Sequence, residues 1–285
     1  RDTTMTSIMT NNSAIAALNT MRSIASDMEK TQGNISTGYK VNDASDNAAY
    51  WSIATTMRSD NKALSTVQDA LGLGAAKTDT AYTGLNSAID VVTEIKSKLV
   101  AAREPGVDKL KIDAELTELK NQLISVSESA SFSGQNWLYN DDSTLNQTVE
   151  MVGSFNRASD NTVSVGILTF DTATSTLVDT YDVQNGLLTG DVTVTVPSGT
   201  TTTTATYFLL DVGAATGASG TEIKLDASTS SDTIDGMISS VELMLAGMTD
   251  SAAVIGSTNM RIDLQNNFVA DLMDVIDKGV GRLVD

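Results

Sequence analysis

Residues 53–102 read IATTMRSDNKALSTVQDALGLGAAKTDTAYTGLNSAIDVVTEIKSKLVAA, and apolar side chains recur there at alternate steps of four and three positions. Only Asp60, Gly74 and Thr78 interrupt this series between Ile53 and Ala102. A repeat that averages 3.5 residues keeps one stripe facing a partner along a left-handed supercoil. The stretch therefore predicts a single helix of about fifty residues, ~75 Å long at ~1.5 Å per residue, that packs lengthwise against other helices.

Three further segments carry the same repeat. It runs through residues 234–283, where only Asn259 and Asn266 are polar, and through shorter stretches at 14–35 and 112–130. The two asparagines either fix the register of the helices or lie at the edge of a wider bundle. Pro105-Gly106 separates the second helix from the third, and Asp108 can cap the third. Four helices are thus expected to pack together.

The middle of the chain has a different composition. Residues 141–230 are rich in Thr, Val, Gly and Asp, and β-branched runs at 148–152, 162–170, 176–183, 191–196, 204–212 and 221–225 predict strands. The predicted fold class is mainly α with a β insertion (α+β), an elongated rod of long antiparallel coiled-coil helices plus a small β-rich outer domain. The expected domains are a helical segment at 1–140, a variable β-rich domain at 141–230, and a C-terminal helix at 231–285 that returns to pack on the N-terminal helices.

Composition narrows the possible functions. The chain has no Cys and no His, which excludes disulfides, thiolate or imidazole catalysis, and zinc bound by these side chains. A net charge of −18 opposes binding to nucleic acid. No nucleophile elbow, phosphate loop or metal constellation is present, so we predict no catalytic residues, no cofactor and no metal. A carboxylate pair of the glycosidase type is the remaining enzymatic alternative, although a solvated acidic face explains the same residues.

Hydropathy along the chain bears on membrane insertion and secretion. No apolar run approaches the ~20 residues needed to cross a bilayer, and the first thirty residues lack the pattern of a signal peptide. We therefore expect no membrane insertion and no ordinary secretion signal.

The segment between the first two helices predicts a tight turn. Gly38 follows an apolar helical stripe, where a left-handed residue would end a helix. Asp43, Ser45 or Asp46 can cap the helix that follows. The acidic turn could instead hold a cation, but it lacks the Gly and the terminal Glu of a calcium loop.

Residues 34–49, NISTGYKVNDASDNAA, resemble the N-terminal signature of bacterial flagellins. The matching positions are Gly38, Asn42, Ala44, Asp46, Ala48 and Ala49. Residues 132–138, FSGQNWL, resemble the segment after that family's third helix at Phe132 and Gly134, and residues 265–268, QNNF, resemble its Gln-Asn-Arg-Phe at Gln265 and Phe268. Residues 10–14 resemble its start. The resemblance covers both flanks of the chain and leaves the middle unassigned.

The resemblance implies a structural, motility-related subunit of the bacterial flagellar filament. Its expected partners are other flagellin subunits in a homopolymer, a flagellar export chaperone and the filament cap, and its expected location is extracellular, on the flagellum or cell surface. A hook-associated junction protein and a cell-surface binding protein with a polysaccharide ligand are the alternatives. The family continues with a further amphipathic helix after the segment that resembles 281–285, so we expect a C-terminally truncated form that stays monomeric, with its first apolar stripe uncovered.

Overall fold

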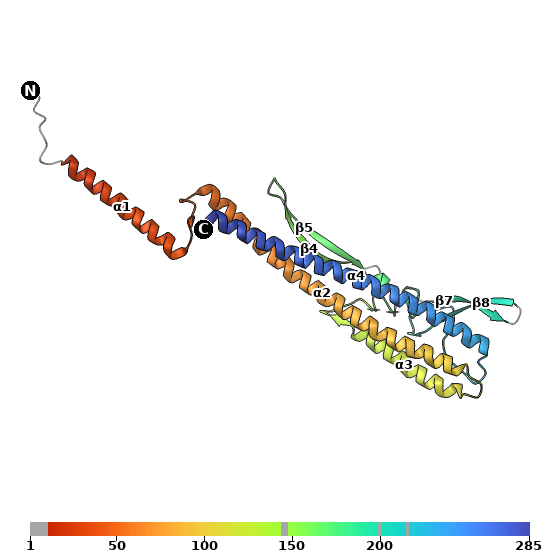
Figure 1. The fold of residues 1–285 in the computed structure, drawn as a ribbon. Coiled ribbons are helices and arrows are strands. Elements are labelled where there is room, and N and C mark those ends of the chain that lie inside the picture. Colours follow the sequence, from red (N-terminus) through yellow and green to blue (C-terminus); the bar gives the residue numbers. More distant parts are fainter. Residues whose placement is uncertain (1–10, 144–147, 199–200, 215–216) are drawn as a thin grey trace, which may run out of the picture. The chain divides into compact units, whose positions relative to one another are not determined.

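The computed structural model describes residues 11–143, 148–198, 201–214 and 217–285, so the motif residue Thr10 lies outside it. The described residues form four α-helices and several short strands, which confirms the α+β class (Figure 1). The helices are α1 (Asn12–Thr37), α2 (Ala48–Ala102), α3 (Lys109–Ser129) and α4 (Ser231–Val284). The chain divides into two compact units, Arg1–Ser65 with Ala270–Asp285 and Thr66–Val269, and both long helices contribute to each.

In the second unit the predicted apolar seam is buried in the core. Every position of the four-and-three series in α2 from Val67 to Ala102 is buried, including the interrupting Gly74 and Thr78. On α4 every seventh residue is buried, and these residues are Ile234, Val241, Met248, Ile255, Ile262 and Val269. The side chains midway between them are half-buried. The periodicity therefore identified the packed face of both helices.

Polar contacts show that α2 and α4 run antiparallel with an unbroken register. Asn259 donates to Asp79 (Nδ2 to Oδ1, 2.6 Å), Lys96 pairs with Glu242, and Arg103 pairs with Asp235. From one pair to the next, the residue number rises along α2 by as much as it falls along α4. Asn259 also accepts from the buried Thr78 hydroxyl at 3.2 Å. These bonds favour the interpretation of Asn259 as a register-fixing residue.

Helix α3 lies along the C-terminal part of α2 (Figure 1). Asp108 caps it, as predicted, by accepting from the Leu110 amide at 3.2 Å. Lys98 on α2 pairs with Glu115 on α3 at 2.7 Å. The buried face of α3 is formed by Ile112, Leu116, Lys120, Leu123 and Ser127.

The strands form four small sheets within the described residues. Their bounds are β1 (Ser131–Phe132), β2 (Gln135–Asn136), β3 (Tyr139–Asn140), β4 (Thr148–Arg157), β5 (Val163–Asp171), β6 (Val178–Asp179), β7 (Val192–Ser198), β8 (Thr201–Phe208) and β9 (Thr221–Glu222). The pairs β1–β2 and β4–β5 are antiparallel, β3–β6 is parallel, and β7–β8–β9 form one sheet. Four of the predicted strands are confirmed with shifted bounds, and the one expected at 221–225 shortens to two residues.

The strand predicted at 176–183 is wrong. That region contains only the two residues of β6, between the 3₁₀ turns η1 (Thr172–Thr174) and η2 (Val183–Asn185). Asp179 accepts from the amides of Tyr181 and Asp182, and Asp182 accepts from the amide of Gln184. Because carboxylates that bind nearby amides compete with strand pairing, the β-branched run folds as turns.

The β4–β5 hairpin reaches the helices where glycine interrupts the α2 seam. A Cβ atom added at Gly74 would lie 2.9 Å from Met151 Sδ on β4 and 3.8 Å from Ile262 on α4. Met151 is itself buried. Gly74 therefore marks the place where a strand side chain, in addition to a helix, packs against α2.

In the first unit the apolar stripe of α1 is not covered. The helix has no buried residue, so the expectation of an uncovered first stripe is confirmed, and the expectation that all four helices pack together is wrong for this one. Its large apolar side chains Ile15, Leu18, Met21, Ile24, Met28 and Ile35 are 45–79% exposed. The core of this unit instead contains Val41, Ala54, Val280 and Val284.

Helix α4 contains a more apolar stretch than the sequence analysis predicted. An 18-residue window within it has a mean hydropathy of 1.3, so by length and composition the helix could cross a membrane. The core helix of a soluble protein can satisfy the same criterion, and one third of this window is buried inside the structure.

Candidate functional site

The first motif forms the turn that joins α1 to α2. Gly38 has φ = +75° and donates its amide to Asn34 O at 2.8 Å, which ends α1. No atom lies within 4 Å of a Cβ added there, so the left-handed backbone, and not crowding, favours glycine. The predicted role of Gly38 is confirmed.

Asp46 organises this turn without capping α2. Its carboxylate pairs with Lys30 Nζ at 2.7 Å and accepts from the amides of Asn42 and Asp43 at 3.0 and 3.5 Å. These interactions, led by the Lys30 hydrogen bond, hold the pKa of Asp46 below its usual value. Asn47 is the cap instead, because its Oδ1 accepts from the amides of Ala49 and Tyr50.

The capping role of Asn47 has a clear signal in the sequence. Asn47 immediately precedes the first helical residue, Ala48, and asparagine is among the strongest N-cap residues. The predicted caps were Asp43, Ser45 and Asp46, and none of them caps α2. Asp43 closes a smaller turn by accepting from the amide and hydroxyl of Ser45, at 2.8 and 2.5 Å.

Backbone hydrogen bonds hold the turn against the last residues of α4. The amides of Lys40 and Val41 both donate to Val284 O, at 2.7 and 3.1 Å. The Val41 side chain is buried with Ala54 and Val280 in the small core of this unit. Asn42, Ala48 and Ala49 are exposed beside it. The motif therefore connects α1, α2 and α4 within one unit.

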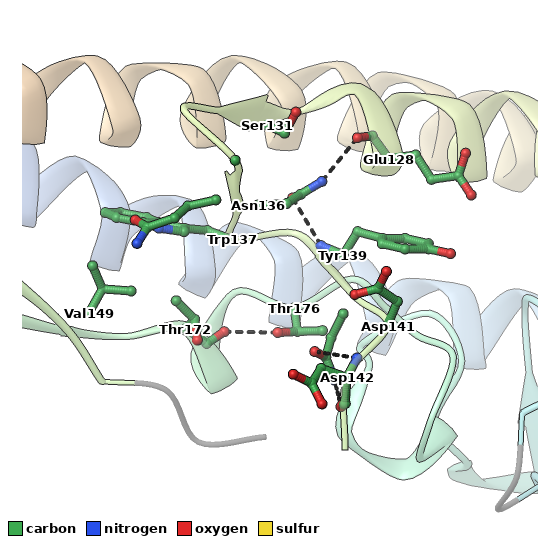
Figure 2. Close-up of a pocket in the computed structure, with 13 residues that line it drawn as sticks. Glu128, Ser131, Asn136, Trp137, Tyr139, Asp141, Asp142, Val149, Thr172 and Thr176 are labelled. Carbon is green, nitrogen blue, oxygen red and sulfur yellow. Dashed lines mark hydrogen bonds between the residues drawn. The ribbon is translucent and has the colours of Figure 1, made fainter. Parts of the chain in front are cut away.

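The second motif forms a tight hairpin after α3. Phe132 pairs with Gln135, and Ser133 and Gly134 between them have φ of +52° and +76°. Two positive φ angles are the requirement of a type I′ turn, which glycine meets readily. Asn136 then donates to the carbonyls of Ser127 and Glu128 and accepts from the amides of Leu138 and Tyr139. Figure 2 shows its bonds to Glu128 and Tyr139. Its side chain joins the hairpin to the end of α3.

The third motif lies on α4. Gln265 is half-buried, and Phe268 is 59% exposed. Phe268 continues a row of exposed apolar side chains with Met260 and Leu264, at 65% and 64% exposure. Residues four apart share one face of a helix, so these three form a continuous apolar face.

A second exposed apolar face lies on the β4–β5 hairpin. Val163, Val165 and Ile167 alternate along β5 and are 53–56% exposed. Val165 pairs with Phe155 across the hairpin, and paired residues lie on the same side of a sheet. We refer to these residues as the β5 face, to Met260, Leu264 and Phe268 as the α4 face, and to the exposed apolar residues of α1 as the α1 stripe. Large exposed apolar patches mark interaction surfaces.

Known proteins resemble this chain along nearly its whole length. The family described as "Bacterial flagellin N-terminal helical region" matches residues 8–143. Flagellin C of Rhizobium meliloti (strain 1021) is 58% identical over 282 residues, which cover 99% of this chain and 88% of that protein. The chain belongs to the flagellin family. Flagellin A of the same strain is 45% identical and covers 99% of this chain and 90% of its own length.

Flagellins are structural subunits of the bacterial flagellar filament, and this chain is one of them. Polymerisation with other flagellin subunits follows from family membership. The crystal structure of Bacillus cereus flagellin aligns with a TM-score of 0.43 and 15% identity, over 72% of this chain and 88% of that one. Identity to flagellins along the chain favours the filament subunit over the junction protein.

The flagellin motifs lie at three places in the structure. Gly38, Asn42, Asp46, Ala48 and Ala49 share the turn of the first unit; Phe132 and Gly134 form the hairpin after α3; and Gln265 and Phe268 lie on α4. No group of three or more acidic side chains in the described part of the chain is arranged to hold a metal ion.

Proposed function

We propose that this flagellar subunit polymerises through the α1 stripe, which its own fold leaves uncovered. Helix α1 has 26 residues, closed at its start by Asn11 and at its end by Gly38, and none of them is buried. Isolated helices are marginal in water, and helices in proteins are mostly stabilised by packing an apolar face. The observation that supports the proposal is thus a complete, capped helix with an unpartnered stripe.

The spacing of the stripe indicates what covers it. Leu18, Met21, Ala25 and Met28 are separated by the same steps of three and four residues that define the buried seam of α2. A stripe with that period fits lengthwise against another helix with a similar stripe. Helices of neighbouring subunits meet this requirement, because members of this family polymerise with other copies.

Two pairs of substitutions, which place carboxylates on opposite faces of α1, test this proposal. Leu18→Asp with Met28→Asp places carboxylates within the stripe, and Asn19→Asp with Ser23→Asp places the same charges on the opposite face. The complete protein is salted out, sedimented and viewed by electron microscopy. We expect the first variant to remain soluble and the second to form filaments; equal assembly of both variants would remove the α1 stripe from the interface.

The β5 face and the α4 face are proposed as further contacts between subunits. Two-stranded hairpins are marginal in water unless a third strand or another element covers their apolar side. Val165→Lys and Leu264→Lys, each made singly, should raise the protein concentration needed for assembly without altering the helical circular dichroism. Assembly at an unchanged critical concentration in both variants would restrict the interface to α1.

The finer assignments follow from this role. We propose that the subunit lies outside the cell in the filament, that an export chaperone and the filament cap are its other partners, and that it has no catalytic activity. We also propose that 1–140 and 231–285, together with the β5 face, form the assembly part and that the rest of 141–230 faces solvent. Cleavage of intact filaments by an added protease should occur within 141–230; cuts confined to the flanks would contradict this division. The monomeric state expected for chain 1–285 stays a prediction, which sedimentation velocity tests.

A further inference from the structure

Two methionines lie in the α1 stripe and are open to solvent in the single subunit. Met21 is 65% exposed and Met28 is 55% exposed. They are seven residues apart, which is about two helical turns, so both side chains lie on the same face of α1. The chain has no cysteine, so the thioethers of its methionines contain its only sulfur atoms. An oxidant that reacts with sulfur is therefore directed to methionine.

Other methionines of the chain are buried and provide an internal comparison. Met237, Met244 and Met248 lie on α4 and are 2%, 2% and 0% exposed. A reagent in solution reaches an exposed thioether directly, but it reaches a buried one only when the structure opens locally. Because susceptibility to oxidation follows exposure, the fold makes Met21 and Met28 more reactive than these three residues.

We propose that Met21 and Met28 are sites at which a peroxide oxidises the unassembled subunit, and that their sulfoxides prevent the subunit from joining a filament. The inference rests on the proposed role of the α1 stripe in assembly. The sulfur lone pair attacks one peroxide oxygen, so that an S–O bond forms and the O–O bond breaks. The departing oxygen takes the proton of the attacked oxygen and leaves as water. The sulfur is thereby oxidised and the peroxide reduced.

The sulfoxide acts on assembly and not on the fold of the single subunit. Oxidation replaces a flexible apolar side chain with a polar one. In the free subunit water solvates the sulfoxide oxygen, because both side chains are exposed. Assembly removes this water, and a polar oxygen buried without a hydrogen-bond donor opposes association. Two sulfoxides in one stripe therefore weaken the same contact twice.

The reaction also depends on the state of assembly. Neighbouring subunits that cover the α1 stripe shield Met21 and Met28 from peroxide, whereas free subunits have no such protection. Peroxide therefore stops the addition of new subunits and spares filaments already formed. A methionine sulfoxide reductase, which returns the thioether, restores the capacity to assemble.

Peptide mapping by mass spectrometry tests the sites of oxidation. The complete protein is treated with dilute hydrogen peroxide before assembly, and the oxidation of each methionine is followed with time. We expect Met21 and Met28 to react roughly tenfold faster, or more, than Met237, Met244 and Met248. Similar rates at the exposed and the buried methionines would overturn the proposal, whatever the role of the α1 stripe.

Matched variants test the effect on assembly. Oxidised subunits should need a roughly hundredfold higher concentration to assemble than untreated ones, about tenfold for each sulfoxide. Met21→Leu with Met28→Leu keeps the stripe apolar without the thioethers, so treatment should raise the concentration that this variant needs by less than about tenfold. Met260→Leu removes an exposed methionine from α4 instead, and after treatment it should assemble much less readily than the double variant. Equal assembly of the treated double variant and the treated unmodified protein would overturn the proposal.

The charged variants of α1 separate this inference from the proposed function. If Leu18→Asp with Met28→Asp prevents assembly and oxidation of the unmodified protein does not, the stripe is an interface but its methionines do not control it. In filaments we expect Met21 and Met28 to be protected from peroxide. If they are oxidised as fast in filaments as in free subunits, the stripe is uncovered and both proposals fail.

Discussion

Two glycines of α2 differ in what surrounds them, and alanine should stabilise the chain at one position but not at the other. A Cβ added at Gly84 would lie 2.6 Å from Ala130 Cβ and 2.8 Å from Leu138 Cδ1, both in the segment that follows α3. A Cβ added at Gly72, on the same helix, would meet nothing within 4 Å. The two substitutions therefore share their effect on helix propensity and differ in packing.

The magnitudes follow from these two terms. Alanine is favoured over glycine in a helix interior by about 1 kcal/mol, so Gly72→Ala should raise the free energy of unfolding by about that amount. At Gly84 the same gain is opposed by ~1–3 kcal/mol for forcing a methyl group into a packed region. Gly84→Ala should therefore be neutral or destabilising by up to about 2 kcal/mol. The difference between the variants is the packing term alone.

Urea unfolding followed by circular dichroism at 222 nm measures both variants, and equal m-values are required for the comparison. A further variant, Gly84→Ala with Ala130→Gly, removes the closest contact and should recover part of the lost stability. If Gly72→Ala and Gly84→Ala stabilise the chain equally, the segment after α3 does not approach α2 as described, and the reasoning fails.

Three further predictions concern single contacts. Asn47→Ala removes the cap of α2 and should cost about 1 kcal/mol in urea unfolding; no loss would mean that another group caps the helix. Burial opposes ionisation of Asp191, but hydrogen bonds from Ser219, Gln184 and Gly220 outweigh it and lower its pKa to about 2. Ionised Asp191 therefore stabilises the folded chain above about pH 4, and this stabilisation is lost as the pH falls toward 2. Asp191→Asn should make the free energy of unfolding less dependent on pH in this range. Lys120→Ala breaks the part-buried ion pair with Glu222, 2.7 Å long, and should lower the free energy of unfolding by about 1–3 kcal/mol. Lys111→Ala breaks the exposed pair with Asp108 and should lower it by less than about 0.5 kcal/mol. Equal losses in the two variants would contradict the difference in burial.

Periodicity predicted the packed faces of the long helices because burial along a helix repeats with the helix itself. The steps from Val67 to Ala102 are all buried, and so is every seventh residue of α4 from Ile234 to Val269. The same periodicity failed for α1, where the stripe is present but no buried residue is. A repeat reveals that a face needs a partner, but the partner can belong to another molecule.

Local hydrogen bonds account for the other errors. Asn47 and Asp46 are both good caps by type, and the choice between them depends on Lys30, which draws Asp46 into the turn. In the middle segment Asp179 and Asp182 bind nearby amides and convert a predicted strand into turns. The cavity beside Trp137 (Figure 2) had no sequence signal, because its lining residues come from separate parts of the chain, at 128–142, Val149, Thr172 and Thr176.

In the filament we expect neighbouring subunits to cover the α1 stripe. Electron cryomicroscopy of filaments assembled from the complete protein, at a resolution that shows side chains, tests it most directly. We predict that Leu18, Met21 and Met28, at 45–65% exposure in the single subunit, are buried against helices of adjacent copies. Filaments in which these side chains face solvent would contradict the account.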